Sequence, residues 1–222
     1  MGIIGVVAAL TLPNLNSSTG DKEKVAKVKK IYSNLNDAMG RAIAVYGPYA
    51  TWMPSGSSSM IIDVADSKEM DRLSDFLKIS KSCSISDYTS CVKLNVIMLL
   101  NSSASARARL IIVGKGAVLA DGTGIWLSGR QIIVDIDGPN KGSNTYGKDI
   151  FLFQISDTGE IYPKGYNDLT DAKILSNVVK GGTYAAAWIM QYDNADYLKT
   201  DSSGKCTNNT SIVLSTTNTT CR

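Results

Sequence analysis

The chain has 222 residues, of which 44% are hydrophobic and 19% are charged, so it is long enough for one globular domain with a core, or for one domain with an appendage. Its formal net charge of +3 is too small to indicate a nucleic-acid partner. It contains no histidine, which removes the commonest general base and the commonest transition-metal ligand. We therefore expect a protein that is not an enzyme and has no catalytic residues.

The chain opens with an apolar segment, Gly2 to Leu12, that ends at Pro13. A bilayer-spanning helix needs about 20 apolar residues, so this segment alone is too short to cross a membrane. Its small and β-branched residues suit close helix packing in lipid. Pro13 would break or kink a helix at that point.

An amphipathic pattern follows the proline. Apolar residues recur at spacings of three and four, which predicts a helix from about Asp21 to about Val45. The residues of this stripe are Val25, Val28, Tyr32, Leu35, Met39, Ala42 and Tyr46. Residues 17–19 offer N-caps, and Gly47-Pro48 ends the helix. The pattern favours one helix packed on a sheet, and a coiled-coil seam is the alternative.

The segment "GIIGVVAALTLPNLN" resembles the second half of the N-terminal helix of type IV pilins and type II secretion pseudopilins. The match runs from the middle of that family's apolar run through Pro13-Asn14-Leu15. The basic leader, the prepilin peptidase site and the early glutamate of the family have no counterpart, so we expect the sequence to be incomplete at its N-terminus. The segments "VDIDGPN", "GKDIFLFQI" and "AAAWIMQYDNADYLK" also look like parts of uncharacterised prepilin-type proteins.

The resemblance implies a pilin-like α+β fold. Residues 1–47 would form the N-terminal helix, with a membrane or filament-core half (1–15) and an amphipathic half (17–47). Residues 48–222 would form the head, a small antiparallel β-sheet with a disulfide-closed C-terminal region at 206–221. The residues expected to pack in the filament are Ile3, Ile4, Val6, Val7, Leu10, Leu12 and Pro13.

The function implied is that of a structural subunit of a type IV pilus or of a secretion filament used in protein transport. Such subunits are made as prepilins, and prepilin processing and methylation are expected with them. The partners would be other pilin or pseudopilin subunits, and the inner membrane before assembly, with a single-pass anchor and the head in the periplasm or on a cell-surface filament. The alternative is a membrane-anchored, adhesin-like binding module whose exposed C-terminal loop contacts a ligand.

The remaining elements are predicted from local patterns. We expect a loop at 47–60, a short helix at 66–80 with Asp66 or Ser67 as its N-cap, and a meander of short antiparallel strands from about Ala117 to Pro163. Asp121-Gly122 predicts a tight turn in that meander. Helical spacing returns at 167–181, residues 183–192 favour another helix, and the C-terminal stretch reads as a hairpin or loop.

The four cysteines fall in two local pairs, Cys83 with Cys91 and Cys206 with Cys221. Two short loops are the simplest of the three possible pairings, and they indicate an oxidising compartment outside the cytoplasm. Four reduced, partly buried thiols are the alternative.

The segment "DIDGPNKGSNTYGKD" is the one candidate metal site. Asp135, Asp137, Asn140 and Asp149 supply oxygen ligands of the kind that calcium prefers, and backbone carbonyls or Asn144 could complete the set. The EF-hand pattern fails, because the twelfth position is Tyr146 instead of Glu. Major pseudopilins resemble this arrangement in having a calcium-stabilised loop, placed elsewhere in the order of motifs. Calcium is thus the one cofactor that the sequence suggests, and a turn that uses these side chains for backbone hydrogen bonds is the alternative.

Overall fold

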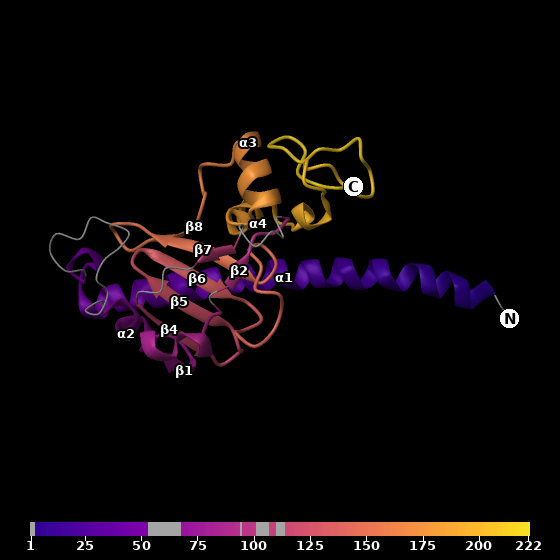
Figure 1. Ribbon diagram of the computed structural model, residues 1–222. Helices are drawn as coiled ribbons and strands as arrows, with labels where there is room; N and C mark the ends of the chain where they lie inside the picture. The colour runs from indigo at the N-terminus through magenta and orange to yellow at the C-terminus, as the bar shows by residue number, and fades with distance from the viewer. Residues whose placement is uncertain (1–2, 53–67, 94, 101–106, 110–113) are drawn as a thin grey trace.

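The structure is a computed structural model that describes the backbone of residues 3–52, 68–93, 95–100, 107–109 and 114–222, and the side chains of those residues except 3–18, 95–97 and 107–109. A long N-terminal helix lies against a six-stranded antiparallel sheet, which makes an α+β fold (Figure 1). The expected N-caps Asp66 and Ser67, and most of the expected loop at 47–60, lie outside the described residues.

Helix α1, Ile3–Tyr46, continues through Pro13 without interruption. Of the break or kink expected at Pro13, the break is therefore wrong, and so is the helix start expected near Asp21, whereas the long N-terminal helix that the pilin-like fold implies is present. Proline removes one hydrogen bond of the helical ladder but leaves the bonds on either side of it, so a helix can continue past it at a cost. The helix ends as predicted at Gly47, which has a φ of +83° and donates its N–H to the Ile43 carbonyl.

The C-terminal half of α1 packs on the sheet. The stripe of the sequence pattern is the buried face of the helix, with Tyr32 half-buried and stacked on Phe153 at 5.9 Å between ring centroids. Tyr46, at the end of the stripe, is 38% exposed. The buried residues of α1 are Val25, Val28, Ile31, Leu35, Ala38, Met39 and Ala42. The prediction of a helix packed on a sheet is thus confirmed.

The sheet has the strand order β1-β4-β5-β6-β7-β8, and every neighbouring pair is antiparallel. The strands are β1 (Ile79–Cys83), β4 (Lys115–Leu119), β5 (Gly124–Ser128), β6 (Gln131–Asp135), β7 (Ile150–Ile155) and β8 (Ile161–Pro163). Strands β4 to β8 form the predicted meander. A separate pair consists of β2 (Asn95–Ile97) and β3 (Arg107–Arg109).

The two faces of the sheet carry different clusters of apolar side chains. The register places Trp126 opposite Ile133, and Ile133 opposite Leu152, on the face away from α1. Their neighbours in sequence point to the other face and form the main core with α1. Both faces are covered, which explains why β5 and β6 read as nearly continuous apolar runs.

Short helices complete the head. They are η1 (Tyr49–Thr51), α2 (Glu69–Ser74), η3 (Ile85–Ser90), α3 (Asp171–Lys173), η5 (Ile174–Lys180), α4 (Ala185–Tyr192) and η6 (Asp196–Lys199). The predicted helix at 167–181 is α3 followed by the π-helical η5, and the helix at 183–192 is α4. Figure 1 shows α3, α4 and the C-terminal segment grouped at one side of the sheet.

Candidate functional site

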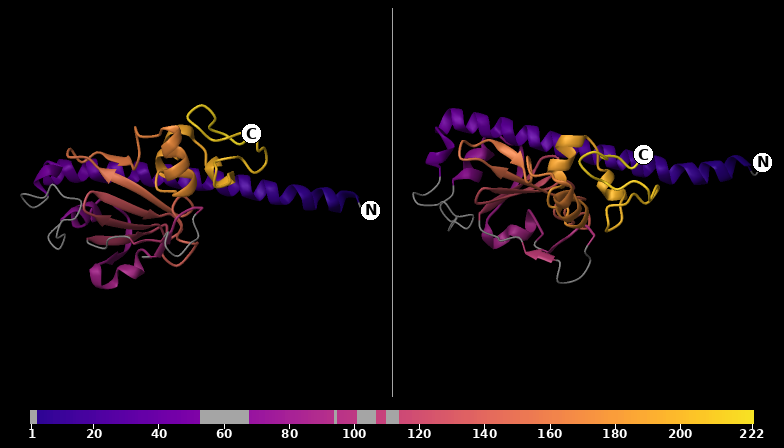
Figure 2. Two further views of the ribbon diagram at one scale, coloured as in Figure 1. Left: turned by 45° about the horizontal axis from the view of Figure 1, so that its top comes forward. Right: turned by 90° about the horizontal axis from the view of Figure 1, so that it is seen from above.

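The residues expected to drive assembly lie in the N-terminal part of α1. Figure 2 shows that this part of the helix extends beyond the head, while the C-terminal part runs along it. Among the residues whose side chains are described, Val25 is the first buried residue of the helix. The expected packing residues Ile3, Ile4, Val6, Val7, Leu10, Leu12 and Pro13 have helical backbone, and their side chains lie outside the described set.

In the part of the chain that the structure describes, we find no helix with the length and apolarity needed to cross a bilayer.

The β6–β7 loop, residues 136–149, is organised around the carboxylate of Asp149. Its Oδ2 accepts the backbone N–H of Ser143 at 2.7 Å and that of Asn144 at 2.9 Å, and its Oδ1 accepts the N–H of Thr145. This ring of donors requires a tight turn, and the positive φ angles of Gly142 (+66°) and Asn144 (+49°) provide it. Asp149 therefore holds the loop in one conformation.

Asp135, at the end of β6, is 0% exposed. Its Oδ1 accepts the N–H of Gly138 at 3.0 Å. Its Oδ2, together with Asp137 Oδ1 and Asn144 Oδ1, is buried without a hydrogen-bond partner among the residues that the structure describes. The Asp135 and Asp137 carboxyls form a hydrogen bond with each other when one of them is protonated, whereas Asn144 Oδ1 has no such partner among the described residues.

The charges of this loop repel one another. Burial raises the pKa of Asp135 to about 8, with further contributions from the adjacent Asp137 carboxyl and the charge of Asp149. Lys24, on α1, faces the same loop. Burial lowers the pKa of Lys24, and the negative charges of Asp21, Asp149 and Asp137 oppose that effect. The loop is thus a place where added positive charge would be stabilising.

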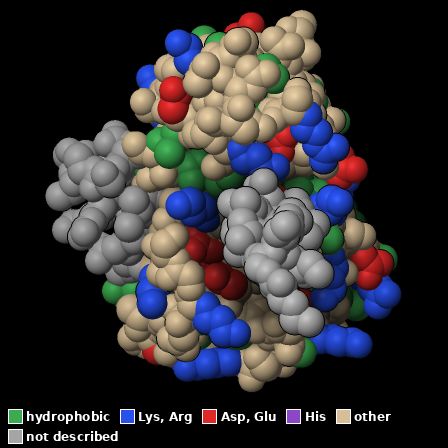
Figure 3. Space-filling model, turned by 90° about the vertical axis from the view of Figure 1, so that its right-hand side faces the viewer, with side chains coloured by type: hydrophobic (Ala, Val, Ile, Leu, Met, Phe, Trp, Pro, Cys, Tyr) green, Lys and Arg blue, Asp and Glu red, His purple; other side chains and the backbone are tan. Residues whose placement is uncertain are grey.

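Three of the four predicted ligands lie together in the structure, and the fourth, Asn140, lies apart from them. The structure brings Asp135, Asp137 and Asp149 together: a Cβ atom on Gly142 would lie 2.3 Å from Asp149 Oδ2 and 2.5 Å from Asp137 Oδ2. Asn140 is exposed at the surface of the loop, whereas Asn144 is 7% exposed. Figure 3, which faces the end from which α1 projects, shows acidic side chains recessed between basic ones.

Among the described residues there is no group of three or more His, Cys, Asp or Glu side chains arranged to hold a metal ion. Asp149 explains part of this, because backbone N–H groups already occupy its oxygens. A cation in this loop would depend on amide and carbonyl oxygens in addition to the carboxylates of Asp135 and Asp137.

Both cysteine pairs are disulfide-bonded as expected, Cys83 with Cys91 and Cys206 with Cys221. The first links the end of β1 to the residue after η3, on the face of the sheet away from α1. The second closes the C-terminal segment, which has isolated bridges instead of regular strands.

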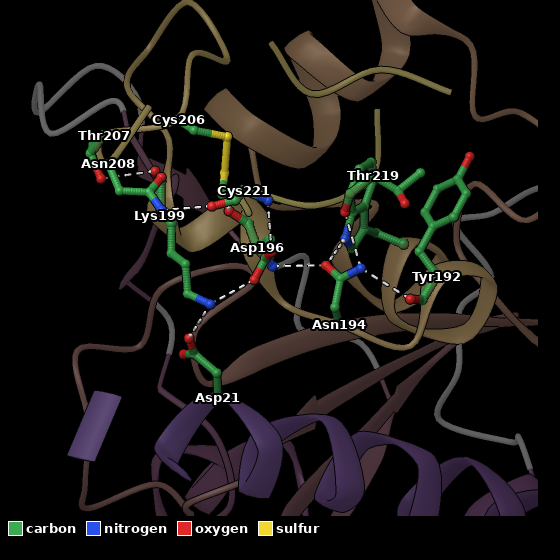
Figure 4. Close-up of polar contacts among 11 residues, drawn as sticks. Asp21, Tyr192, Asn194, Asp196, Lys199, Cys206, Thr207, Asn208, Thr219 and Cys221 are labelled. Atoms are coloured by element: carbon green, nitrogen blue, oxygen red, sulfur yellow. Dashed lines mark hydrogen bonds and ion pairs between the residues drawn. A yellow bond between two sulfur atoms is a disulfide. The ribbon is translucent and has the colours of Figure 1, made fainter. Parts of the chain in front are cut away.

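A polar network ties the C-terminal disulfide to α1 (Figure 4). Asp196, 5% exposed, accepts the N–H of Cys221 at 2.8 Å and a hydrogen bond from Lys199 Nζ at 2.6 Å. The same ammonium lies 3.4 Å from the carboxylate of Asp21 on α1. Asn194 adds a bond from its amide to the Thr219 carbonyl. The sequence carries no signal for this network, because it joins residues 194–199 to Asp21 and to residues 219–221, which are far away in the chain and come together only on folding.

Comparisons with protein-family models, with curated proteins and with solved structures find no match to this chain.

Proposed function

We propose that this chain is a pilin-like structural subunit that assembles into a filament, of the type IV pilus or type II secretion kind, through the N-terminal part of α1. The observation that supports this most is that the two ends of one continuous helix differ: one end packs in the head and the other projects from it. From Val25 onward α1 contributes a buried stripe to the head, whereas its N-terminal part extends past the head and begins with the apolar segment Gly2 to Leu12.

The physical basis of assembly is exchange of helix contacts. A helix of 44 residues is about 66 Å long at 1.5 Å per residue. Asp21 still contacts Lys199 of the head, so the part of α1 before Asp21 is the part that extends beyond it. In a membrane its apolar residues contact lipid, and in a filament they contact the same residues of neighbouring subunits. Small residues such as Gly2, Gly5, Ala8 and Ala9 permit close approach of helix backbones, which favours association in lipid.

The head is suited to a position outside the cytoplasm. Two disulfides close short loops, and such bonds persist in oxidising compartments. The lack of histidine in the sequence supports a structural role over a catalytic one.

A charge placed in the apolar segment tests the proposal. In the cells that make this protein, Val7→Lys should move it out of the membrane fraction and abolish filaments, because a lysine in the centre of a membrane helix costs about 3 kcal/mol. The matched control is Val45→Lys, at the other end of α1, where the side chain is already 63% exposed. It should leave both properties unchanged.

Two results would count against the proposal. If Val7→Lys leaves membrane association and filaments intact, the segment does not drive assembly. If the unaltered protein is held in membranes but never polymerises, the anchored binding module becomes the better interpretation.

A further inference from the structure

Lysine side chains lie around α1 at the point where the helix leaves the head. Three of them, Lys22, Lys24 and Lys27, belong to α1, and Lys148 belongs to the β6–β7 loop. Lys24, Lys27 and Lys148 line one open pocket beside α1. Lys22 lines a second pocket, between α1 and the segment that contains η6. We call these four lysines the basic rim. Figure 3 shows this end of the head, with Lys and Arg side chains at the surface and acidic ones recessed between them.

The acidic residues of α1 at this end already have ion-pair partners, whereas part of the basic rim does not. Asp21 pairs with η6 at 3.4 Å, and Glu23 pairs with Lys27 at 2.9 Å. Lys22 and Lys148 are exposed and form no ion pair within the described part of the chain. The rim therefore presents uncompensated positive charge to its surroundings.

The basic rim is close to the apolar segment along the helix axis. Lys22 lies about 15 Å beyond Leu12, at 1.5 Å per residue. Helical side chains tilt toward the N-terminus of their helix, so the Lys22 side chain extends back toward the apolar segment. The headgroup layer of a bilayer adds about 5–7 Å outside the hydrocarbon core, and charges attract one another over about 8 Å at physiological salt. With Gly2 to Leu12 in hydrocarbon, the rim is within range of the headgroups.

We propose that the basic rim is a docking surface for anionic phospholipid headgroups of the membrane that α1 enters. This inference rests on the proposed function, because it needs the N-terminal part of α1 to lie in a membrane. It goes further by assigning the head a role there, with a preference for one class of lipid. The contact holds the unassembled head at the membrane surface, and it is released when the subunit enters a filament.

The position of the rim favours a membrane over a soluble acidic partner. Its lysines line two separate pockets beside the helix that carries the apolar segment. A lipid surface entered by that helix faces both pockets at once. Attraction between lysines and an anionic lipid surface also needs no shaped cavity, because it depends on charge and distance.

The test offers the full chain a choice between two membranes. Protein in mild detergent is diluted into equal amounts of phosphatidylcholine vesicles and of vesicles that also contain phosphatidylglycerol, and the two kinds are separated by density. At low ionic strength we expect at least about tenfold more protein on the anionic vesicles, because each lysine near an anionic surface adds to the attraction. The ratio should approach equality as NaCl is raised, because salt screens the charges.

A triple variant removes the positive charge of the rim. Lys22→Gln, Lys27→Gln and Lys148→Gln together should reduce the ratio to about twofold or less at low ionic strength. All three residues are exposed, so the variant should keep the near-ultraviolet circular dichroism of the unaltered protein.

The matched control removes the same amount of charge at the other end of the head. It combines Arg41→Gln, Lys68→Gln and Lys78→Gln. Arg41 forms an i,i+4 ion pair on α1, as Lys27 does. Lys68 and Lys78 are exposed on either side of α2, which Figure 1 shows away from the projecting end of α1. This variant should keep the preference of the unaltered protein.

A single change that strengthens binding gives a result that misfolding cannot imitate. Glu23→Gln removes the exposed carboxylate beside Lys27 and should raise the ratio at least about twofold. Asp37→Asn removes the corresponding carboxylate beside Arg41 and should leave the ratio unchanged.

The possible failures are distinguishable. Protein recovered on neither kind of vesicle contradicts the insertion of α1, and the inference falls with it. Protein that binds both kinds equally at low ionic strength leaves the insertion of α1 standing and overturns the role of the basic rim. A preference that survives in the rim variant overturns it as well. A preference that the control variant loses to the same extent reflects only the net charge of the chain, which also contradicts the inference.

Discussion

At the scale of single residues, Glu69 is a carboxyl group that the fold buries completely. It is 0% exposed, and its Oε1 accepts a 2.6 Å hydrogen bond from the Tyr49 hydroxyl. Burial raises the pKa of Glu69, while the Tyr49 bond and the charge of Arg130 act in the opposite direction. The folded state thus holds this proton more tightly than the unfolded state does.

This raised pKa predicts a pH dependence of stability. As pH rises from 4.5 through the raised pKa, the free energy of unfolding should fall, because the folded state then has to ionise a buried group. A tenfold difference in proton affinity between the folded and unfolded states corresponds to a fall of about 1.4 kcal/mol. Glu69→Gln keeps an acceptor for Tyr49 and removes this titration, so the fall should become smaller by the share of Glu69, while the share due to the raised pKa of Asp135 remains. Urea unfolding at several pH values measures it.

Glu160→Gln is the control, because Glu160 is exposed. It should retain the pH dependence of the unaltered protein. Equal slopes for the Glu69→Gln variant and the unaltered protein would show that Glu69 is not the group responsible.

At the scale of elements, Lys199 joins η6 to α1. Its ammonium contacts both the nearly buried Asp196 and the partly exposed Asp21. Lys199→Met should lower the free energy of unfolding by about 1–2 kcal/mol, since Asp196 would keep its burial and lose a charged partner. Chemical unfolding of the oxidised protein measures this.

The control for that change is Lys173→Met. Lys173 lies 3.5 Å from Asp168, and both side chains are about half exposed. Exposed pairs of this kind contribute about 0–1 kcal/mol, so the loss should be near zero. An equal loss for the two lysines would mean that the tie to α1 contributes nothing beyond surface charge.

The elements also show how far the sequence predicts the fold. The meander β4 to β8 is predictable, because apolar residues and turn signals such as Asp121-Gly122 are local. Strand β1 is not predictable in the same way, because "ISKSC" is polar and mostly exposed at the sheet edge. The helix break expected at Pro13 was predicted from that residue alone. The backbone hydrogen bonds on both sides of Pro13 also determine whether the helix continues, and here it does.

The candidate site is predictable only in part for a related reason. The spacing of Asp135, Asp137 and Asp149 marks an oxygen-rich loop, but spacing cannot say which side chains turn inward. The structure places Asn144 inside and Asn140 outside, and it occupies Asp149 with backbone N–H groups. Burial of single side chains depends on the packing of the whole loop against α1 and β6.

At the scale of the whole molecule, the two halves of α1 have different surroundings. Its C-terminal half is part of the head's core, so the head cannot rotate freely on the helix. Its N-terminal half extends from that core as the same continuous helix. A force or contact acting on the projecting half is therefore passed directly to the sheet, which suits a subunit that carries load in a filament.

The most direct test of this account is electron cryo-microscopy of surface filaments sheared from the cells that make the protein, with the chain identified by an antibody to its head. The account predicts filaments with the N-terminal halves of α1 bundled along the axis and the heads outside. Filaments held together by heads alone, or antibody-labelled protein found only as single molecules, would contradict it.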